Sequence, residues 1–409
     1  MTASPEQAVG PEEVIRRVLA DLPRHRGVVV DSPPGAGKST LVVRAAAHLA
    51  ATGEPLMIVA QTNEQVDDLV ARICDKHPHL TVGRLSASGY IPPLRMLELP
   101  GARVGTRIQD LGDPDIVIAT ADKWAWIGDR VWPWAIVDEA YQMRSDKLLR
   151  IAGLFERALF VGDPGQLDPF SIVDGDRWSG LSWDPLQSAV SVLLRHNPDL
   201  PVHRLPVSWR LPASAAPVVS RAFYPFTGFR SGTEHGDRWL ELSTGGMGTV
   251  HDRALEEAAR SGWALLELPN RHTVRTDGEA VQAVALLAER LLQRGALAGS
   301  EQGERPVTAD RIAVGAAHRD QVAAIRAAGL PPEITVDTAN RLQGREYDVT
   351  IVLHPCRAAA TPPPSTWSRD GCACWPRGTG TRAWWWPERA SPSCWTPTRR
   401  PSRCSSGCR

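Results

Sequence analysis

The sequence lacks the features that mark membrane, secreted, fibrous and disordered proteins. No window approaches the roughly 18 consecutive apolar residues that a membrane-spanning helix requires. Residues Met1–Gly10 show no basic stretch followed by an apolar run, so we expect no secretory signal and a cytoplasmic protein. Hydrophobic residues at 43% and charged residues at 22% are typical of a globular chain. No period of about 20–50 residues recurs, which argues against a solenoid.

The end of the chain lacks every large aliphatic residue. No Leu, Ile, Val, Phe or Met follows Leu353, so residues 356–409 cannot build an ordinary hydrophobic core. The same stretch holds six of the seven cysteines, and its nine arginines against two acids give a net charge of +7. Because the whole chain balances 46 basic with 46 acidic residues, residues 1–355 carry −7. The net charge of zero is therefore the sum of an acidic segment and a basic segment of different composition.

Before this tail, short apolar runs alternate with helical patterns. The first buried strand is predicted at Gly27–Asp31 and is followed, after a Gly/Pro turn, by a helix at Ser39–Ala51. Such alternation indicates parallel sheets covered by helices on both faces. We predict two α/β domains, 1–205 and 206–355, and a non-native or disordered tail at 356–409. The other predicted elements are the strands Leu56–Ala60, Asp115–Ala119, Ala135–Val137, Ala158–Val161, Trp263–Leu268, Arg311–Val314 and Thr350–Leu353, and the helices Glu64–Cys74 and Glu279–Leu292.

The segment Asp31–Thr40 (DSPPGAGKST) lies between the first strand and the first helix, which is the setting of a phosphate-binding loop. Gly35 and Gly37 let backbone N–H groups close around phosphate oxygens, and the start of the helix adds its positive end. Lys38 supplies a charge for the terminal phosphates, and Ser39 supplies a hydroxyl for Mg²⁺. A Pro/Gly turn with an incidental Lys-Ser pair is the alternative.

Two further strands end in polar residues. Ala135–Ala140 (AIVDEA) places Asp138 and Glu139 after a strand, where Asp138 would hold Mg²⁺ and Glu139 would deprotonate the attacking water. Two acids after an apolar run are otherwise typical of a solvated loop. Phe160–Phe170 (FVGDPGQLDPF) carries Gln166, an amide that could sense the γ-phosphate or, taken alone, belong to a turn. Together with the phosphate loop, these segments predict a nucleotide site at one edge of a sheet.

The order of these motifs resembles that of the superfamily 1 helicases, with the nonsense-mediated-decay helicase and its bacterial relatives as the most similar branch. DSPPGAGKST, IVAQTNEQVDDL, AIVDEAYQM and FVGDPGQLDPF follow in register in the first domain. LPVSWRLP at 205–212, RIAVGAAHRDQVAAI at 311–325 and VDTANRLQGREYDV at 336–349 continue the resemblance in the second. The resemblance spans roughly residues 25–355. It implies two RecA-like P-loop NTPase domains that bind ATP and Mg²⁺ between them.

The resemblance also implies roles for individual residues. Lys38, Glu139, Gln166 and Arg210 would be catalytic, with Arg210 acting as an arginine finger on the γ-phosphate. Trp209, in place of the family's usual tyrosine, would stack on the base. A surface salt bridge for Arg210 and a core position for Trp209 are the alternatives. The implied ATP-binding set is Pro34, Gly35, Ala36, Gly37, Lys38, Ser39, Thr40, Trp209, Gln343, Gly344 and Glu346, and the magnesium set is Ser39 and Asp138.

Nucleic-acid contacts are implied at a different strand end. Thr62, Asn63 and Gln65 resemble the family's strand-contacting motif, and small polar side chains there would bind single-stranded DNA or RNA without reading its sequence. An Asn helix cap is the alternative. A cluster of tryptophans is predicted to pack beneath the strand before Asp138, with base stacking as the alternative. The cluster comprises Trp124, Trp126, Trp132 and Trp134.

The family's last motif, an apolar strand with Ser/Thr-Arg, is missing after Val349–Leu353. Repeated tryptophan codons (TGG), read displaced by two bases, become valine codons, so Ala383–Trp386 would form a β-branched strand in another frame. We hypothesise that a one-base slip, between about codons 350 and 365, replaced the native C-terminus. A disordered basic arm and a zinc-binding segment are the alternatives, although the tail has neither paired CxxC spacing nor histidine.

The sequence therefore predicts an ATP-dependent nucleic-acid helicase or translocase of superfamily 1. Loss of the last arginine motif would impair hydrolysis by this chain while leaving Mg-ATP binding intact. A catalytically silent nucleotide-binding interaction protein is the alternative. A small-molecule kinase is more remote, because Phe160–Phe170 and Val336–Val349 would have no explanation.

Overall fold

A computed structural model describes residues 10–128, 130–166, 178, 184–269, 276–342 and 345–353, and the backbone of a strand at 381–384. These residues form two compact units, one up to His235 and one from Gly236. The units divide later than the predicted residue 205, because residues 206–235 pack against the phosphate loop of the first unit.

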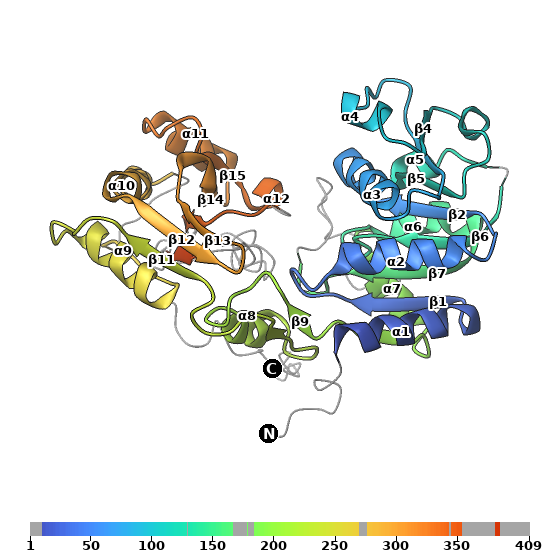
Figure 1. Cartoon of the computed structure of the whole chain (residues 1–409), viewed down its shortest axis with the longest axis horizontal. Helices are drawn as coiled ribbons and strands as arrows, with labels where there is room; N and C mark the ends of the chain where they lie inside the picture. The colour runs from blue at the N-terminus through green and yellow to red at the C-terminus, as the bar shows by residue number, and fades with distance from the viewer. Residues whose placement is uncertain are drawn as a thin grey trace, which may run out of the picture. The chain divides into compact units, whose positions relative to one another are not determined.

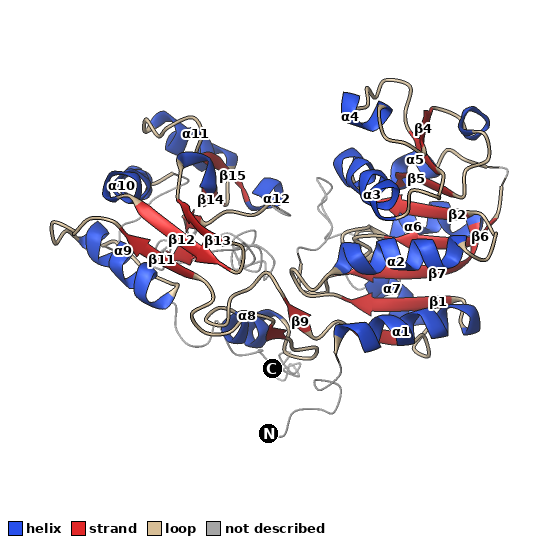
Figure 2. Cartoon of the chain, viewed as in Figure 1, coloured by secondary structure: helices blue, strands red, loops and turns tan. Residues whose placement is uncertain are grey.

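The first unit is built on one sheet of eight parallel strands in the order β4-β3-β5-β2-β6-β7-β1-β8 (Figures 1 and 2). β1 and β7 pair in register from Gly27–Ala158 to Asp31–Gly162, so both strands end at the same level. A parallel sheet of this kind gathers the loops that follow its strands at one edge. In chain order the strands are β1 Gly27–Asp31, β2 Leu56–Ala60, β3 Val82–Leu85, β4 Ala102–Gly105, β5 Ile116–Thr120, β6 Trp132–Val137, β7 Phe155–Gly162 and β8 Val202–Arg204.

Helices cover both faces of this sheet. α1, α2 and α3 pack on one face, and α5, α6 and α7 pack on the other (Figure 1). Successive strand residues alternate between the two cores: Val28 and Val30 belong to the first and Val29 to the second. The central strands are apolar throughout for this reason. The helices are α1 Pro11–Asp21, α2 Lys38–Ala50, α3 Asn63–Lys76, α4 Leu94–Leu97, α5 Ala121–Trp124, α6 Ser145–Ile151 and α7 Ala189–His196, with 3₁₀ turns at Leu22–Arg24, Ile108–Leu111 and Ala152–Leu154.

The first unit ends in a small connecting segment, Val207–Thr233. β9 (Val207–Ser208) pairs in parallel with β10 (Arg230–Ser231), and α8 (Ala216–Phe223) joins them. We call this the β9–α8–β10 segment. Its turn after α8 is fixed by hydrogen bonds from Gly228 N to Tyr224 O, at 2.8 Å, and from Phe229 N to Ser220 Oγ, at 3.0 Å.

The second unit holds two separate sheets. One is parallel, in the order β15-β14-β16-β17, and the other is antiparallel, in the order β11-β12-β13. Helices α9, α10 and α11 pack with these strands around one core. The elements are β11 Trp239–Leu242, α9 Val250–Ser261, α10 Gly278–Arg294, β12 Ala296–Ser300, β13 Gly303–Pro306, a 3₁₀ turn Ala309–Arg311, β14 Ile312–Ala316, α11 Arg319–Ala327, β15 Thr335–Thr338, α12 Ala339–Leu342, β16 Val349–Val352 and β17 Thr381–Trp384.

The predicted α/β class with parallel sheets is confirmed, but the predicted strand Trp263–Leu268 is wrong. The segment makes only an isolated bridge at Leu265. Ala264 and Leu266 are buried while Leu265 is 44% exposed, so the segment is an extended stretch lying on the core. Alternating burial produced the strand-like pattern without a ladder of hydrogen bonds.

Of the predicted tail 356–409, the structure describes only the backbone of β17. This strand pairs in parallel with β16 from Val349–Thr381 to Val352–Trp384. The rest of the tail lies outside the described residues. Within the described part of the chain, no helix has the length and apolar character to cross a membrane.

Candidate functional site

Three neighbouring strands of the first unit, β6, β7 and β1, end in buried carboxylates. Asp31 closes β1, Asp138 follows β6 and Asp163 follows β7, with exposed fractions of 5%, 6% and 1%. Burial raises the pKa of Asp31, although Tyr141 donates a hydrogen bond to its Oδ1 at 2.7 Å. A buried carboxylate is stable only beside a cation or a hydrogen-bond donor, so we expect such groups at this edge of the sheet.

The loop between β1 and α2 has the backbone that phosphate binding requires. Gly35 and Gly37 have φ of 69° and 89°, in the left-handed region that favours glycine. Gly37 is the N-cap of α2, and no atom lies within 4 Å of the place where a Cβ would stand on it. The start of a helix behind an open glycine turn is a ready anion site. The structure places the predicted residues Pro34, Gly35, Ala36, Gly37, Lys38, Ser39 and Thr40 in this one turn.

Lys38 reaches from the loop to the acids after β6. Its Nζ donates a hydrogen bond to Glu139 Oε1, and the two side chains are 17% and 14% exposed. Burial opposes the charge of Lys38, but Glu139 and Asp138 outweigh it and raise the pKa of the lysine. Burial raises the pKa of Asp138 to about 6, against the lowering effect of Lys38. The structure thus brings the predicted lysine and both predicted acids into one coupled group.

Glu139 adopts an unusual backbone conformation. Its φ is 51°, a left-handed value that is uncommon for a residue other than glycine. Its N–H donates to Asp138 Oδ1 at 3.0 Å. Gln142 Nε2 donates to Glu139 Oε2, at 3.3 Å, and to Gln166 Oε1. Gln142 therefore connects the predicted water-activating acid to the predicted γ-phosphate sensor.

The start of the β9–α8–β10 segment lies on the phosphate loop. Ser208 Oγ donates to Pro34 O at 2.5 Å, and Trp209 N donates to Gly35 O at 3.0 Å. A Cβ added to Gly35 would overlap Arg210, so this contact requires glycine. Trp209 is 55% exposed, which excludes the alternative of a core position. The chain that carries Arg210 is therefore positioned against the loop by its backbone.

The residues predicted to contact nucleic acid take part in local structure at the start of α3. Thr62 Oγ1 accepts from Gln65 N at 3.3 Å, and Gln65 Oε1 accepts from Thr62 N at 3.1 Å, which forms a capping box. Asn63 Oδ1 accepts from Nη2 of the buried Arg84 at 3.0 Å. The helix is therefore capped by Thr62 rather than by Asn63. A strand contact by these residues remains a prediction.

The tryptophans divide between core and surface. Trp124 and Trp132 are fully buried with their rings edge to face at 5.6 Å, and Trp134 is 5% exposed. Trp126 is 86% exposed and does not share this packing. The predicted cluster is therefore confirmed only in part: Trp124 packs on Trp132 at one face of β6, whereas Trp134 belongs to the core on the other face.

The site residues predicted in the second unit are only partly described. Gln343 and Gly344 lie outside the described residues, and Glu346 is exposed. Asp348, close behind them, accepts two hydrogen bonds from Arg311, at 2.9 and 3.1 Å. The predicted contact of Gln343, Gly344 and Glu346 with a nucleotide stays a prediction.

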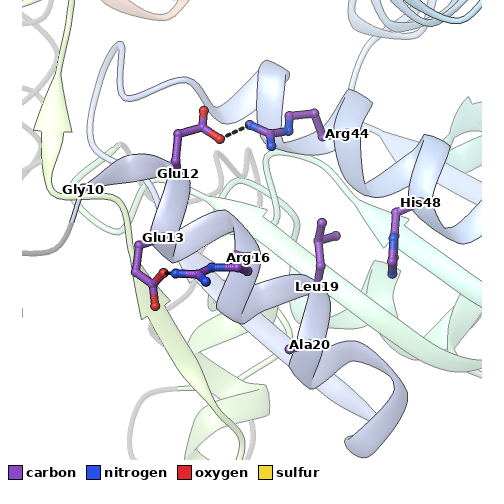
Figure 3. A pocket seen from close by; sticks show the side chains of 8 residues that line it. All are labelled: Gly10, Glu12, Glu13, Arg16, Leu19, Ala20, Arg44 and His48. Atoms are coloured by element: carbon purple, nitrogen blue, oxygen red, sulfur yellow. Dashed lines mark hydrogen bonds and ion pairs between the residues drawn. The ribbon is translucent and has the colours of Figure 1, made fainter.

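A pocket lies between α1 and α2, away from the predicted residues (Figure 3). Its charges are paired within its walls: Glu12 binds Arg44 across the two helices at 2.6 Å, and Glu13 binds Arg16 along α1. His48 lines it on α2. Because its ion pairs are already formed, the pocket mainly shows how α1 is fixed to the helix that starts at Lys38.

The donor set at the sheet edge fits magnesium bound together with a nucleotide. No group of three or more His, Cys, Asp or Glu residues that could hold a metal occurs in the part of the chain described. Mg²⁺ in nucleotide sites usually takes one or two protein oxygens and completes its shell with phosphates and water. Asp138 and the Ser39 hydroxyl are oxygen ligands of this kind.

Sequence reasoning missed the residues that hold the site together. Tyr141 and Gln142 stand inside the motif AIVDEAYQM, and their spacing from Glu139 was the available signal. Ser208 is adjacent to Trp209, but its contact with Pro34 depends on how distant segments fold together. Tyr224, whose hydroxyl donates to Asp163 Oδ1 at 2.6 Å, had no local signal.

Comparisons with known proteins yield one family model and several solved structures. Residues 8–181 match the model of a family described as an AAA domain. A search of curated proteins finds no match. The solved arterivirus nonstructural protein 10 helicase matches with 13% identity and a TM-score of 0.48, covering 94% of this chain and 64% of that one. The arterivirus helicase in complex with DNA matches with 13% identity and a TM-score of 0.49, covering 94% and 65%. This chain thus spans a little under two thirds of those helicases, and a likeness of this size supports no conclusion about activity.

Proposed function

We propose that the first unit, in which residues 8–181 match the model of an AAA domain, binds and hydrolyses Mg-ATP, as the resemblance of its motifs to those of the superfamily 1 helicases implies. The observation that carries the proposal is the buried group of Lys38, Asp138 and Glu139 beside the glycine turn at 35–37. Bound Mg²⁺ would neutralise charge on the phosphate oxygens and so favour attack at phosphorus.

The residues of the site account for the remaining chemistry. Phosphate oxygens compete with Glu139 for the ammonium of Lys38, so nucleotide binding releases Glu139 Oε1 to accept a proton from water. Gln142 holds the other oxygen of Glu139 and so orients the carboxylate. Arg210, placed beside Gly35, would stabilise charge on the transferred phosphoryl group, an effect of about 10³–10⁵ in rate for an arginine finger.

We further propose that ATP turnover drives movement along single-stranded DNA or RNA, as in a helicase or translocase. The order of the motifs supports this, and so does the position of the predicted strand-contacting residues. Thr62 and Asn63 follow β2, which pairs with β6, the strand before Asp138. Gln61 Nε2 donates to Asp138 O at 3.3 Å, so these residues are joined to the acid that would hold magnesium.

The proposal is tested by ATP hydrolysis measured with and without single-stranded nucleic acid. Turnover should rise with the strand, and Glu139→Gln should lower it by about 10²–10⁴-fold, the usual contribution of a general base. Lys38→Ala should abolish turnover through loss of nucleotide binding. Lys147→Ala, which removes a surface lysine paired with Asp122, should leave it unchanged.

Two results would contradict the proposal that ATP hydrolysis drives movement along a strand. Stimulated turnover that survives in Glu139→Gln would remove the proposed base. Tight ATP binding without any turnover, also in a chain whose proposed C-terminal frame has been restored, would favour a catalytically silent nucleotide-binding protein.

A further inference from the structure

A buried hydrogen bond fastens the loop that carries Gln166 to the end of α8. Tyr224 OH donates to Asp163 Oδ1 at 2.6 Å, and the two residues are 3% and 1% exposed. The same oxygen accepts from Gly165 N at 3.0 Å. One carboxylate oxygen therefore fixes both the turn before Gln166 and the side chain of Tyr224. The proposed chemistry of ATP hydrolysis makes no use of this contact.

The ring of Tyr224 is also fitted closely to the loop. A Cβ added to Gly165 would stand 2.6 and 2.8 Å from atoms of the ring and 3.0 Å from Phe223 O. Contacts this short require glycine. Because packed interiors are not continuously deformable, a shift of the Gln166 loop must either move Tyr224 or break the hydrogen bond.

The β9–α8–β10 segment is thus held at two nucleotide-facing loops. Its start is bound to the phosphate loop through Ser208 and Trp209, and the end of α8 is bound to Asp163. The pairing of β9 with β10 and the Gly228–Tyr224 hydrogen bond join the two attachments. Only Glu234 and His235 separate the end of the segment from Gly236, the first residue of the second unit.

We propose that Tyr224 is a positioning residue that transmits the state of the Gln166 loop to the β9–α8–β10 segment, and so to the start of the second unit. The inference rests on the proposed function, because it takes Gln166 as the sensor of the γ-phosphate. Hydrogen bonds connect Glu139 to Gln142 and Gln142 to Gln166, and the turn at Asp163 completes the path to Tyr224. Tyr224 itself touches neither nucleotide nor water in this scheme.

The test is amide hydrogen exchange of the full chain without nucleotide, with Mg-ADP and with a non-hydrolysable Mg-ATP analogue. It needs no turnover. In the unsubstituted protein, exchange at Gly228 and Arg230, whose amides donate to Tyr224 O and Pro206 O, should differ by at least about fivefold between ADP and the analogue. In Tyr224→Phe this difference should fall below about twofold while both nucleotide affinities stay within about threefold.

Two further variants keep the result interpretable. Gly165→Ala should reduce the difference in the same way, because the added methyl displaces Tyr224 from the other side. Tyr90→Phe is the matched control: it removes a hydroxyl that donates to Asp67 in the same unit, and it should retain the full difference.

The proposal is overturned if Tyr224→Phe keeps the difference of the unsubstituted protein, or if the unsubstituted protein binds both nucleotides with no change in the segment. Absence of any nucleotide binding would overturn the proposed function together with this inference, so the two failures are distinguishable.

Discussion

Among single residues, Asp138 is predicted to lower the stability of the folded protein at neutral pH while it serves the proposed magnesium site. It is 6% exposed, and burial raises its pKa to about 6 from the ordinary 3.8. The folded protein therefore holds this proton more tightly than the unfolded chain does. Between about pH 4 and pH 6 the folded state binds more protons, so its free energy of unfolding falls as the pH rises.

The fall of the free energy of unfolding with rising pH leads to a prediction for Asp138→Asn. The amide oxygen can still accept from Glu139 N, but it carries no charge to bury. At pH 7.5 the variant should have a higher free energy of unfolding, on the order of 1–3 kcal/mol for a pKa shift of about two units, and the gain should vanish near pH 4. Urea denaturation followed by tryptophan fluorescence measures both values.

Asp68→Asn provides the control for this measurement. Asp68 lies on α3, half exposed and paired with Arg72, so its loss should change stability by less than about 0.5 kcal/mol at either pH. An Asp138→Asn gain that does not depend on pH would contradict the account, as would a loss at pH 7.5.

At the scale of elements, burial on both faces decided what could be predicted. β1, β2 and β5 lie inside the sheet and are apolar apart from the last residues of β1 and β5, so their sequences alone located them. β11, β12 and β13 were missed because they are short, and every residue of β13 (Gly303–Pro306) is exposed. α1 was missed although Pro11 and two acids mark its first turn.

The candidate site shows the same division. Asp138 and Glu139 were predictable because they follow β6 directly, and Lys38 because it begins the helix after the loop that follows β1. Parallel strands end at a common edge. Ser208 and Tyr224 were not, because their partners are distant in the sequence and are brought close only by the docking of the β9–α8–β10 segment.

Two arginine–aspartate pairs give an element-scale prediction, one that joins α3 to β3 and one within α3. Arg84 is fully buried and binds Asp67 at 3.0 Å, whereas Arg72 and Asp68 are both more than half exposed. Arg84→Met should lower the free energy of unfolding by about 3–5 kcal/mol, because it leaves a buried carboxylate without its charge partner. Arg72→Met, the matched exposed change, should cost less than about 0.5 kcal/mol. Equal losses, measured by urea denaturation, would show that the buried pair does not anchor α3.

At the scale of the whole molecule, the division into two units follows contacts that composition does not reveal. We predicted a boundary between two domains at residue 205, but residues 206–235 pack on the phosphate loop and cluster with the first unit. Charge separates a different pair of segments, residues 1–355 at −7 and 356–409 at +7.

The tail leads to a prediction about the coding DNA. β17 pairs with β16 at the place where the resemblance requires one more strand, and its residues overlap the run Ala383–Trp386 that reads as valine codons in a displaced frame. Sequencing of the DNA across codons of about 345–370 should reveal an open frame that encodes an apolar strand followed by Ser/Thr-Arg. Absence of such a frame would make this tail the native end of the second unit.

If ATP turnover drives movement along a single strand, the nucleotide state of the Lys38 site must change the affinity of the protein for that strand. The most direct measurement is the affinity for a single-stranded oligonucleotide, as DNA and as RNA at one fixed salt concentration, without nucleotide, with Mg-ADP and with a non-hydrolysable Mg-ATP analogue. The account predicts that affinities in the ADP and analogue states differ by at least about fivefold, and that Lys38→Ala but not Lys147→Ala removes the difference. The same affinity in all three states would contradict it.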